Sequence, residues 1–440
     1  MKKYFIILLL LCSQIAIAFP TITEINPTID SLMKQVNIDS LESYIRYLQD
    51  LGPRPRVDTG EYAEAHQNNI AAKNWLYNQY TTIGNLDVYH NHFLPVELGD
   101  TVYSMAMNVV AVQVGTEYPD EYIIVCGHFD TYYSQYFNSE FNLQFRGPGA
   151  DDNASGTAGA MEIARVLSPH SFKRSIIYLS TNGEESSGKA PMGSGLFAYY
   201  CRQNDINILG VFDLDMIGYN PIDMPLVLFY STGYHYDSTD NKINISEDFE
   251  KYFGEVANLY ITDIPVIQSP SAGAGDNTMF IIQDYPAMYL GDALGLAYST
   301  DYYMNPCYHR LCDTIGIGKE DAGVNSMELV KAYTQATLAA IAELAELSEI
   351  SIKEYAHMNC IINPNPANET ASLTLHFNDA GFLSVTLNNI LGQEVMELHN
   401  AFLDTKIFVK TFSLSDLAKG MYYLKIIHNG NVRVEKIIKN

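Results

Sequence analysis

Short apolar runs alternate with segments of helical periodicity from about residue 105 to residue 347, and this alternation constrains the fold more than any other feature. The apolar runs are NVVAVQV, EYIIVCGHFD, SIIYLSTNGEE, ILGVFDLDMIG and YPAMYLGD, and the helical segments include SGTAGAMEIARVL, GLFAYYCRQN and LVKAYTQATLAAIAELAEL. Short strands separated by helices indicate a parallel sheet with helices on both faces. We therefore expect an α/β fold with a mostly parallel mixed central sheet.

The segments before and after this alternating region have different sequence patterns. Residues 28–93 predict helices joined by a turn at GPRPR. After residue 360, apolar and polar residues alternate in SLTLHF, LSVTLNN, KIFVKTF, GMYYLKIIH and VRVEKIIK, which is typical of a small all-β sandwich. The predicted ranges are 19–347 for the α/β domain, 348–360 for a linker and 361–440 for the sandwich.

Residues 1–18 predict a secretory signal peptide. Lys2 and Lys3 precede an apolar stretch, and Ala16-Ile17-Ala18 suits a cleavage site. The stretch is short for a membrane helix, and no later segment has the ~18 uninterrupted apolar residues that such a helix needs. We expect a secreted protein with no stable membrane insertion.

Four of the predicted strands end in side chains that could bind a metal ion. These residues are His128, Asp130, Glu184, Glu185, Asp215 and Asp292. The turn GPGADDNASG adds Asp151, Asp152 and Asn153 before a predicted helix, and CYHRLCDT adds His309. Taken singly, each acidic residue suits a turn or a helix cap equally well. Together they would meet at the carboxyl ends of the strands, where ligands of open α/β sheets bind.

Such a cluster of carboxylates and imidazoles would repel itself without a counter-charge. A divalent metal ion supplies that charge, and mixed nitrogen and oxygen ligands suit zinc. Glu184 and Glu185 are adjacent, and consecutive side chains of an extended strand point to opposite sides. One of them could therefore bind the metal while the other acts as a general base on the attacking water.

Five motifs, GHFD, GADDNASG, NGEE, LDMIG and CYHRLCDT, resemble those of the M28 metallopeptidases, the co-catalytic dizinc aminopeptidases. They occur in the order of that family, and the resemblance covers about residues 28–345. It implies a zinc-dependent exopeptidase with two Zn²⁺ ions per chain, which removes N-terminal residues from peptide substrates.

The resemblance also implies a set of zinc ligands. His128 and Asp215 would bind one zinc ion, and Glu185 and His309 the other. Asp152 would bridge the two ions.

The same resemblance implies catalytic roles for three further residues. Glu184 would be the general base and then the acid that protonates the leaving amine. Asp130 would hold the second ring nitrogen of His128. Tyr308 would stabilise the tetrahedral oxyanion, as a tyrosine does in some members.

One segment departs from the family pattern, because AGAGDNTMF has Asp276-Asn277 where members often have Asp-His. The departure puts in doubt the role that this histidine has around the zinc ligands, but it does not affect the predicted zinc ligands themselves. The aromatic segment TYYSQYFNSEFNLQFRGPG either lines the substrate cleft or forms a surface loop with its own small cluster.

Five cysteines remain after removal of the predicted signal peptide, and export permits disulfides. Cys307 and Cys312 flank a tight turn and are the best candidate pair, and by the resemblance their bridge would stiffen the loop of Tyr308. Cys126 lies in an apolar strand, which predicts a buried thiol. The sequence assigns no partner to Cys201 or Cys360.

The C-terminal segment resembles the sorting domains of type IX secretion cargo in INPNPAN, NNILGQEV, LAKGMYYLKI and the final KIIK. This resemblance implies the outer-membrane secretion machinery as a partner and an extracellular or cell-surface location. A substrate- or glycan-binding module is the alternative, since β-sandwiches have many functions.

The net charge of −25 lies entirely in residues 1–360, because residues 361–440 contain seven basic and seven acidic residues. An acidic body without a basic patch repels phosphate backbones, so we expect no nucleic-acid partner. The same charge is compatible with attracting a peptide amine or with solubility alone.

Two other functions compete with the aminopeptidase. The first is a glutaminyl cyclase-like enzyme, which is expected to use a single zinc ion. The second is a non-catalytic binding protein on the same scaffold. Such proteins typically lose ligands or the base, whereas every expected position is filled here.

Overall fold

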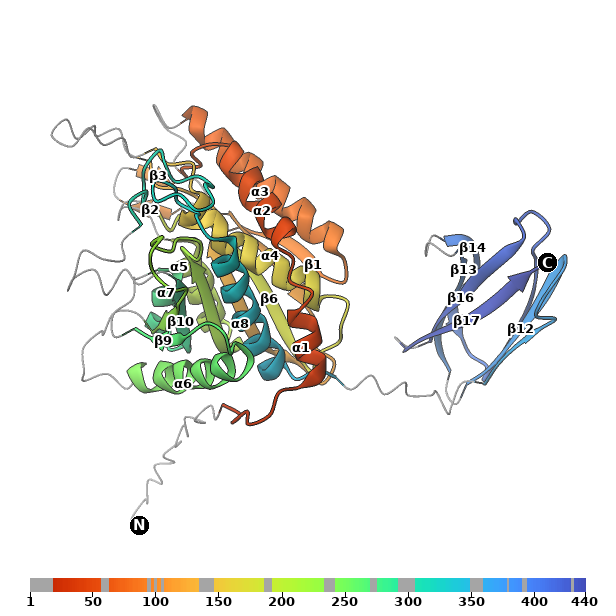
Figure 1. Cartoon of the computed structure of the whole chain (residues 1–440). Helices are drawn as coiled ribbons and strands as arrows, with labels where there is room; N and C mark the ends of the chain where they lie inside the picture. The colour runs from red at the N-terminus through yellow and green to blue at the C-terminus, as the bar shows by residue number, and fades with distance from the viewer. Residues whose placement is uncertain are drawn as a thin grey trace, which may run out of the picture. The chain divides into compact units, whose positions relative to one another are not determined.

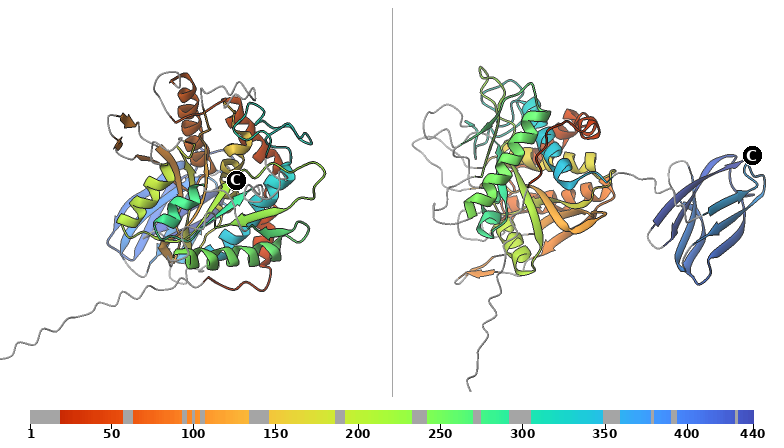
Figure 2. Two further views of the ribbon diagram at one scale, coloured as in Figure 1. Left: turned by 90° about the vertical axis from the view of Figure 1, so that its left-hand side faces the viewer. Right: turned by 90° about the horizontal axis from the view of Figure 1, so that it is seen from below.

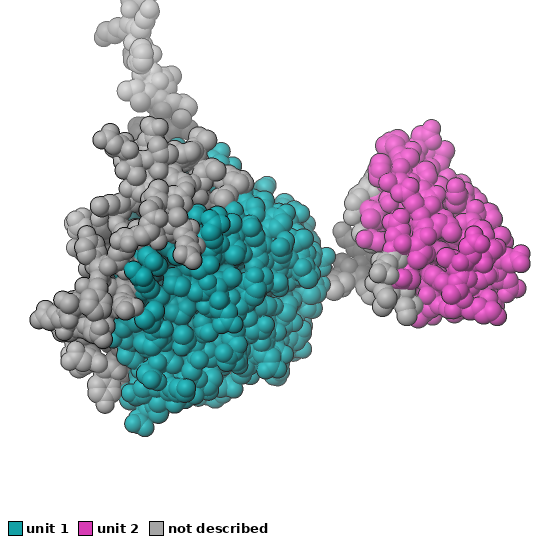
Figure 3. Space-filling view, turned by 90° about the horizontal axis from the view of Figure 1, so that it is seen from above, with its two compact units in different colours: residues 1–348 teal, residues 349–440 magenta. Residues whose placement is uncertain are grey.

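The computed structural model divides into two compact units, residues 1–348 and 349–440, and each is described by itself (Figure 3). The structure describes residues 19–56, 63–92, 96–98, 101–103, 107–133, 146–185, 192–232, 242–269, 275–291, 305–348, 359–377, 380–389, 394–428 and 431–440. The predicted signal peptide, Asp292, most of the aromatic segment and most of the predicted linker lie outside these ranges.

An eight-stranded mixed sheet forms the centre of unit 1, in the order β1-β4-β6-β5-β7-β10-β8-β9 (Figure 1). The strands are β1 (Asp87–His92), β4 (Met107–Gln113), β5 (Tyr118–His128), β6 (Arg174–Thr181), β7 (Asn207–Asp215), β8 (Leu228–Ser231), β9 (Val266–Gln268) and β10 (Ala287–Gly291). Strands β6, β5, β7 and β10 run parallel, whereas the pairs β1–β4, β4–β6 and β10–β8 are antiparallel. This arrangement confirms the predicted mostly parallel mixed sheet.

Alternate side chains of the central strands enter two separate cores. Ile123 and Val125 of β5 pack in one core, whereas Ile124 and Cys126 of the same strand pack in the other. The first core is shared with α1 (Pro27–Met33), α2 (Ile38–Asp50), α3 (Ala63–Ile83), α4 (Gly156–Leu167), α6 (Lys242–Tyr260) and α8 (Met327–Ala345). The second core is shared with α5 (Gly193–Gln203) and α7 (Asp276–Ile282). Helices therefore cover both faces of the sheet, as Figure 2 shows.

The N-terminal region differs from its prediction at one point. Helices α1, α2 and α3 form as expected, but Asp87–His92 is the edge strand β1 and not a helix. Its partner is β4, with Val88 opposite Ala111. A short ribbon of β2 (Val96–Leu98) and β3 (Thr101–Tyr103) follows. The sequence analysis did not identify α6, β8 or β9.

Unit 2 consists of two antiparallel sheets. One contains β11 (Asn359–Asn363), β12 (Thr370–His376) and β15 (Ile407–Ser413), and the other β14 (Glu394–Leu403), β13 (Gly381–Asn388), β16 (Gly420–His428) and β17 (Asn431–Lys439). Leu373 and Leu375 of β12 meet Val385 and Leu387 of β13 in one core, and all four are fully buried. The predicted all-β unit is confirmed, although β11 and β14 were not among the predicted strands.

Among the described residues, no helix combines the length and the apolar character that crossing a membrane requires.

Helix α4 begins in close contact with β7 because Gly156 has no side chain. A Cβ at this position would lie 1.9 Å from the carbonyl oxygen of Leu214, although φ −66° and ψ −42° suit alanine. We predict that Gly156→Ala lowers the free energy of unfolding by about 2 kcal/mol or more, because overpacking against the backbone cannot relax. Urea denaturation followed by circular dichroism measures the change.

Gly195→Ala in α5 is the matched control. Its Cβ would meet Sδ of Met279 at 3.1 Å, and that flexible side chain can move. The expected change is below about 1 kcal/mol. Equal losses in the two variants would contradict the packing argument.

Candidate metal centre

Three adjacent parallel strands, β6, β5 and β7, bring their carboxyl ends to one edge of the sheet. Strand β5 ends at His128 and β7 ends at Asp215. Strand β6 ends at Thr181, so Glu184 and Glu185 lie in a turn beyond it. The expectation that NGEE continues the strand is therefore wrong, and the turn decides where the two glutamates point.

In the segment before α4, the adjacent residues Asp151 and Asp152 have different roles. Residues 150–155 form a distorted helical turn in which Asp152 leaves the helical conformation. Both carboxylate oxygens of Asp151 accept hydrogen bonds, from the backbone N–H of Gly218 at 2.8 Å and from Nδ2 of Asn305 at 2.7 Å. Asp151 therefore joins loops together, whereas the carboxylate of Asp152 faces two imidazoles.

His128, Asp152 and Asp215 form the first cluster. Nε2 of His128 lies 3.3 Å from Oδ1 of Asp152 and 3.6 Å from Oδ1 of Asp215. All three residues are buried, and one potential ligand atom of each lies within 4.8 Å of the others. This spacing suits a single cation held by one nitrogen and two oxygens.

Asp152, Glu185 and His309 form the second cluster. Nε2 of His309 lies 2.7 Å from Oε1 of Glu185 and 3.1 Å from Oδ2 of Asp152. Their potential ligand atoms also lie within 4.8 Å of one another. The two oxygens of Asp152 thus face two different imidazoles, and the clusters share this one carboxylate.

Several atoms at the centre have no hydrogen-bond partner within the described part of the chain. They are Nε2 of His128, Oδ2 of Asp152 and Oδ1 of Asp215, and all three are buried. Buried polar atoms are normally hydrogen-bonded. Their convergence fits a metal ion, and the mixture of imidazole nitrogen and carboxylate oxygen fits zinc.

The carboxylates also raise the proton affinity of both imidazoles. Burial lowers the pKa of His309, but its contacts with the carboxylates of Asp152 and Glu185 outweigh burial and bring this pKa to about 10. The pKa of His128 is likewise raised despite burial, through Asp130, Asp152 and Asp215. Added positive charge therefore stabilises both clusters. A divalent cation supplies that charge while its ligands remain unprotonated.

Asp130 connects the first cluster to the two glutamates. Nδ1 of His128 lies 3.2 Å from the carbonyl oxygen of Asp130 and 3.6 Å from its Oδ1. The carboxylate of Asp130 also accepts the backbone N–H groups of Glu184 and Glu185, each at 3.2 Å. One residue thus orients the imidazole through its backbone and the turn of both glutamates through its side chain.

Glu184 and Glu185 occupy different positions in this turn. Glu185 contacts His309, whereas Oε2 of Glu184 lies 3.9 Å from Nε2 of His128. The side chain of Glu184 is 16% exposed and that of Glu185 is 8% exposed, so Glu184 is the more accessible. Burial raises the pKa of both, that of Glu185 to about 8. The predicted division between a ligand and a base is compatible with these positions.

His309 and Tyr308 lie in a loop closed by a disulfide between Cys307 and Cys312, the predicted pair. His309 has a positive φ of 60°, a conformation that few residues other than glycine adopt. Burial raises the pKa of Tyr308, so its phenol keeps its proton. Cys126 and Cys201 are buried free thiols, which confirms the prediction for Cys126, and Cys360 is also free.

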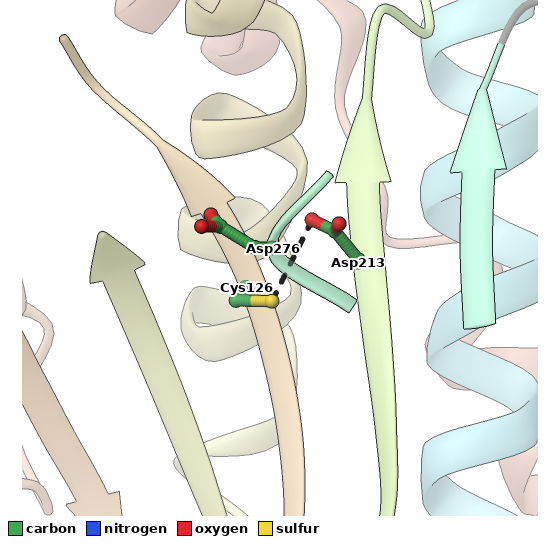
Figure 4. Close-up of side chains that lie close together, drawn as sticks. All are labelled: Cys126, Asp213 and Asp276. Atoms are coloured by element: carbon green, nitrogen blue, oxygen red, sulfur yellow. Dashed lines mark hydrogen bonds between the residues drawn. The ribbon is translucent and has the colours of Figure 1, made fainter. Parts of the chain in front are cut away.

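Cys126, Asp213 and Asp276 form a further buried group of side chains that lie close together (Figure 4). Sγ of Cys126 donates to Oδ1 of Asp213 at 3.6 Å, and Asp276 accepts a hydrogen bond from Thr181. The backbone N–H of Asn277 donates to Asp213 at 2.9 Å. The segment that departs from the family pattern thus attaches the start of α7 to β7.

Sequence reasoning missed Arg54, which is fully buried. Its guanidinium donates to the carbonyl oxygens of Phe129 at 2.8 Å and Gly149 at 3.0 Å. Arg54 therefore ties the end of β5 to the segment that leads into Asp152. The motif GPRPR was the available signal, because an arginine between prolines is unsuited to a helix interior. Phe129 and Gly149, however, are more than 70 residues away in the chain.

Comparison with known proteins identifies the family of the chain. The model of peptidase family M28 matches residues 108–334, and that of a secretion system C-terminal sorting domain matches residues 361–440. A probable zinc metalloprotease of Pyrenophora teres is 29% identical over 197 residues, which are 43% of this chain and 38% of that protein. The chain thus spans about two fifths of the length of the curated relatives it matches.

Solved structures share the fold of unit 1. The LapA aminopeptidase of Legionella pneumophila aligns with a TM-score of 0.54 and 20% identity, covering 74% of this chain and 75% of that one. A glutaminyl cyclase of Bacteroides thetaiotaomicron aligns with a TM-score of 0.52 and 18% identity, covering 71% and 98%. Because the family match spans just over half of its residues, the chain belongs to peptidase family M28, and it carries a secretion system C-terminal sorting domain.

Proposed function

We propose that the chain is a secreted aminopeptidase that uses two zinc ions. The proposed zinc ligands are His128, Asp152, Glu185, Asp215 and His309. The observation that carries the proposal is the position of Asp152, whose oxygens lie 3.3 Å and 3.1 Å from the Nε2 atoms of two different imidazoles. A carboxylate in that position can bind one cation through each oxygen.

Two zinc ions suit the site better than one. Each cluster supplies an imidazole and a carboxylate of its own besides the shared Asp152. A glutaminyl cyclase-like enzyme with a single zinc ion would leave one of these sets without a cation. The fold similarity to a glutaminyl cyclase does not separate the two functions, because an aminopeptidase aligns equally well.

Zinc would act as a Lewis acid that activates water and polarises the carbonyl group of the substrate. Glu184 would take the proton from the attacking water and then donate a proton to the leaving amine. Burial raises the pKa of Glu184 well above its usual value. A raised pKa suits a carboxyl group that must both accept and donate a proton.

Two other side chains complete this chemistry. Tyr308 would donate a hydrogen bond to the developing oxyanion, since its raised pKa keeps the phenol protonated. Asp130 would hold the ring of His128, to which it is already hydrogen-bonded through its backbone.

The other parts of the chain support action on peptides outside the cell. The sorting domain implies delivery through the type IX secretion machinery of the outer membrane to the cell surface or the medium. The acidic charge of residues 1–360 suits a substrate with a free α-amine.

Replacing the proposed base tests the mechanism. Glu184→Gln keeps the size of the side chain but cannot accept a proton. We expect kcat to fall by about 10²- to 10⁴-fold, while zinc content stays at the wild-type value. Peptidase assays and metal analysis on the same preparation measure both. Glu117→Gln changes an exposed glutamate outside the site and serves as the control. Wild-type turnover by Glu184→Gln would refute the assignment.

Metal analysis tests the shared carboxylate. We expect two zinc ions per wild-type chain. Asp152→Asn should lower the affinity for both ions, because the side chain loses its negative charge and an amide nitrogen replaces one of its two oxygens. The matched variant Asp151→Asn should retain both, since the carboxylate of Asp151 only accepts hydrogen bonds from loops. Wild-type affinity for both ions in Asp152→Asn would contradict the bridging role.

A substrate panel tests the aminopeptidase assignment. Peptides with free N-termini should be cleaved, and N-blocked peptides should not, because the substrate amine must reach the acidic site. A chelator should abolish cleavage. Formation of pyroglutamate from N-terminal glutamine with one zinc ion per chain would favour a glutaminyl cyclase. No cleavage of any peptide by the fully metal-loaded protein would indicate a binding protein.

A further inference from the structure

The two imidazoles of the metal centre are oriented in different ways. A histidine that binds a metal usually donates its other ring N–H to a carboxylate or a carbonyl group. His128 follows this pattern, with Nδ1 3.2 Å from the carbonyl oxygen of Asp130. For His309, only Nε2 makes a hydrogen bond to another described residue, and its partner is Glu185. Within the described part of the chain, no hydrogen bond to Nδ1 orients the second ring.

Aromatic stacking supplies that support. The ring of Tyr132 is stacked on His309, with centroids 4.4 Å apart and an angle of 13° between the planes. Tyr308 is also stacked on this ring, at 3.7 Å and 27°. Stacked rings fix the plane of an imidazole and still allow its Nε2 to point along that plane. The positive φ of His309 describes its backbone and does not fix the plane of its ring.

We propose that Tyr132 is a positioning residue for the second cluster. Its ring holds the imidazole of His309 so that Nε2 points toward Asp152 and Glu185, at 3.1 Å and 2.7 Å. Tyr132 performs for His309 what Asp130 performs for His128. The inference rests on the proposed zinc ligation and adds a residue outside the ligand set and the proton-transfer groups.

The position of Tyr132 makes it suitable for a mutational test. It is partly exposed and follows the end of β5 at the beginning of the aromatic segment. Its neighbour Tyr133 is equally partly exposed, but contacts the guanidinium of Arg146, which lies 5.2 Å from the ring centroid. Tyr133 is therefore a matched control with the same side chain and a different partner.

Zinc affinity provides the test. Competition with a chromophoric chelator measures the two binding constants of wild type and of Tyr132→Leu, Tyr132→Phe and Tyr133→Leu. We expect Tyr132→Leu to bind one zinc ion about 10- to 100-fold more weakly and the other with wild-type affinity. Tyr132→Phe keeps the ring and should keep both affinities, and Tyr133→Leu should also keep both. The absorption spectrum of the cobalt-substituted protein should change in Tyr132→Leu alone.

The thermal unfolding of the metal-free proteins separates positioning from folding. It should be the same for Tyr132→Leu and Tyr133→Leu, because both side chains are only partly buried. Two wild-type zinc affinities in Tyr132→Leu would overturn the inference, as would an equal loss of affinity in both leucine variants. A wild-type chain that binds fewer than two zinc ions would instead refute the proposed function, so the two failures are distinguishable.

Discussion

The carboxylate of Asp152, placed between the imidazoles of His128 and His309, is the interaction on which the rest of the site depends. Burying a charge is costly unless it is paired and hydrogen-bonded. Burial alone would raise the pKa of Asp152, but both imidazoles outweigh it and hold this pKa well below its usual range. The geometry of each cluster is thereby linked to the other through one side chain. A displacement of Asp152 would disturb both clusters together.

The surrounding structure holds Asp152 from several directions. Asp313 accepts the backbone N–H of Asp151 at 2.8 Å and that of Asp152 at 3.2 Å. Arg54 donates to the carbonyl oxygen of Gly149 just before this turn, and Gly156 lets α4 start against β7 just after it. These contacts come from segments far apart in the chain. Hydrogen bonds of the surrounding scaffold thus fix the position of Asp152.

The two units separate catalysis from export. Unit 1 contains the candidate metal centre, and unit 2 has its own hydrophobic core. The net charge lies in residues 1–360, whereas residues 361–440 are neutral. A unit with its own core can fold without the other. The described residues that form the two clusters all belong to unit 1, and the sorting domain lies in unit 2.

The sequence by itself determined the fold class of both units, because apolar periodicity reports which faces of strands and helices are buried. It also determined which residue types gather at the strand ends, since parallel strands bring their carboxyl ends to one edge. Only the tertiary structure decided that the oxygens of Asp151 are occupied by loop contacts, that Asp130 holds the turn of the two glutamates, and that Tyr132 stacks on His309. Periodicity describes neighbours within an element, whereas these contacts join loops distant in the chain and follow from how the elements pack.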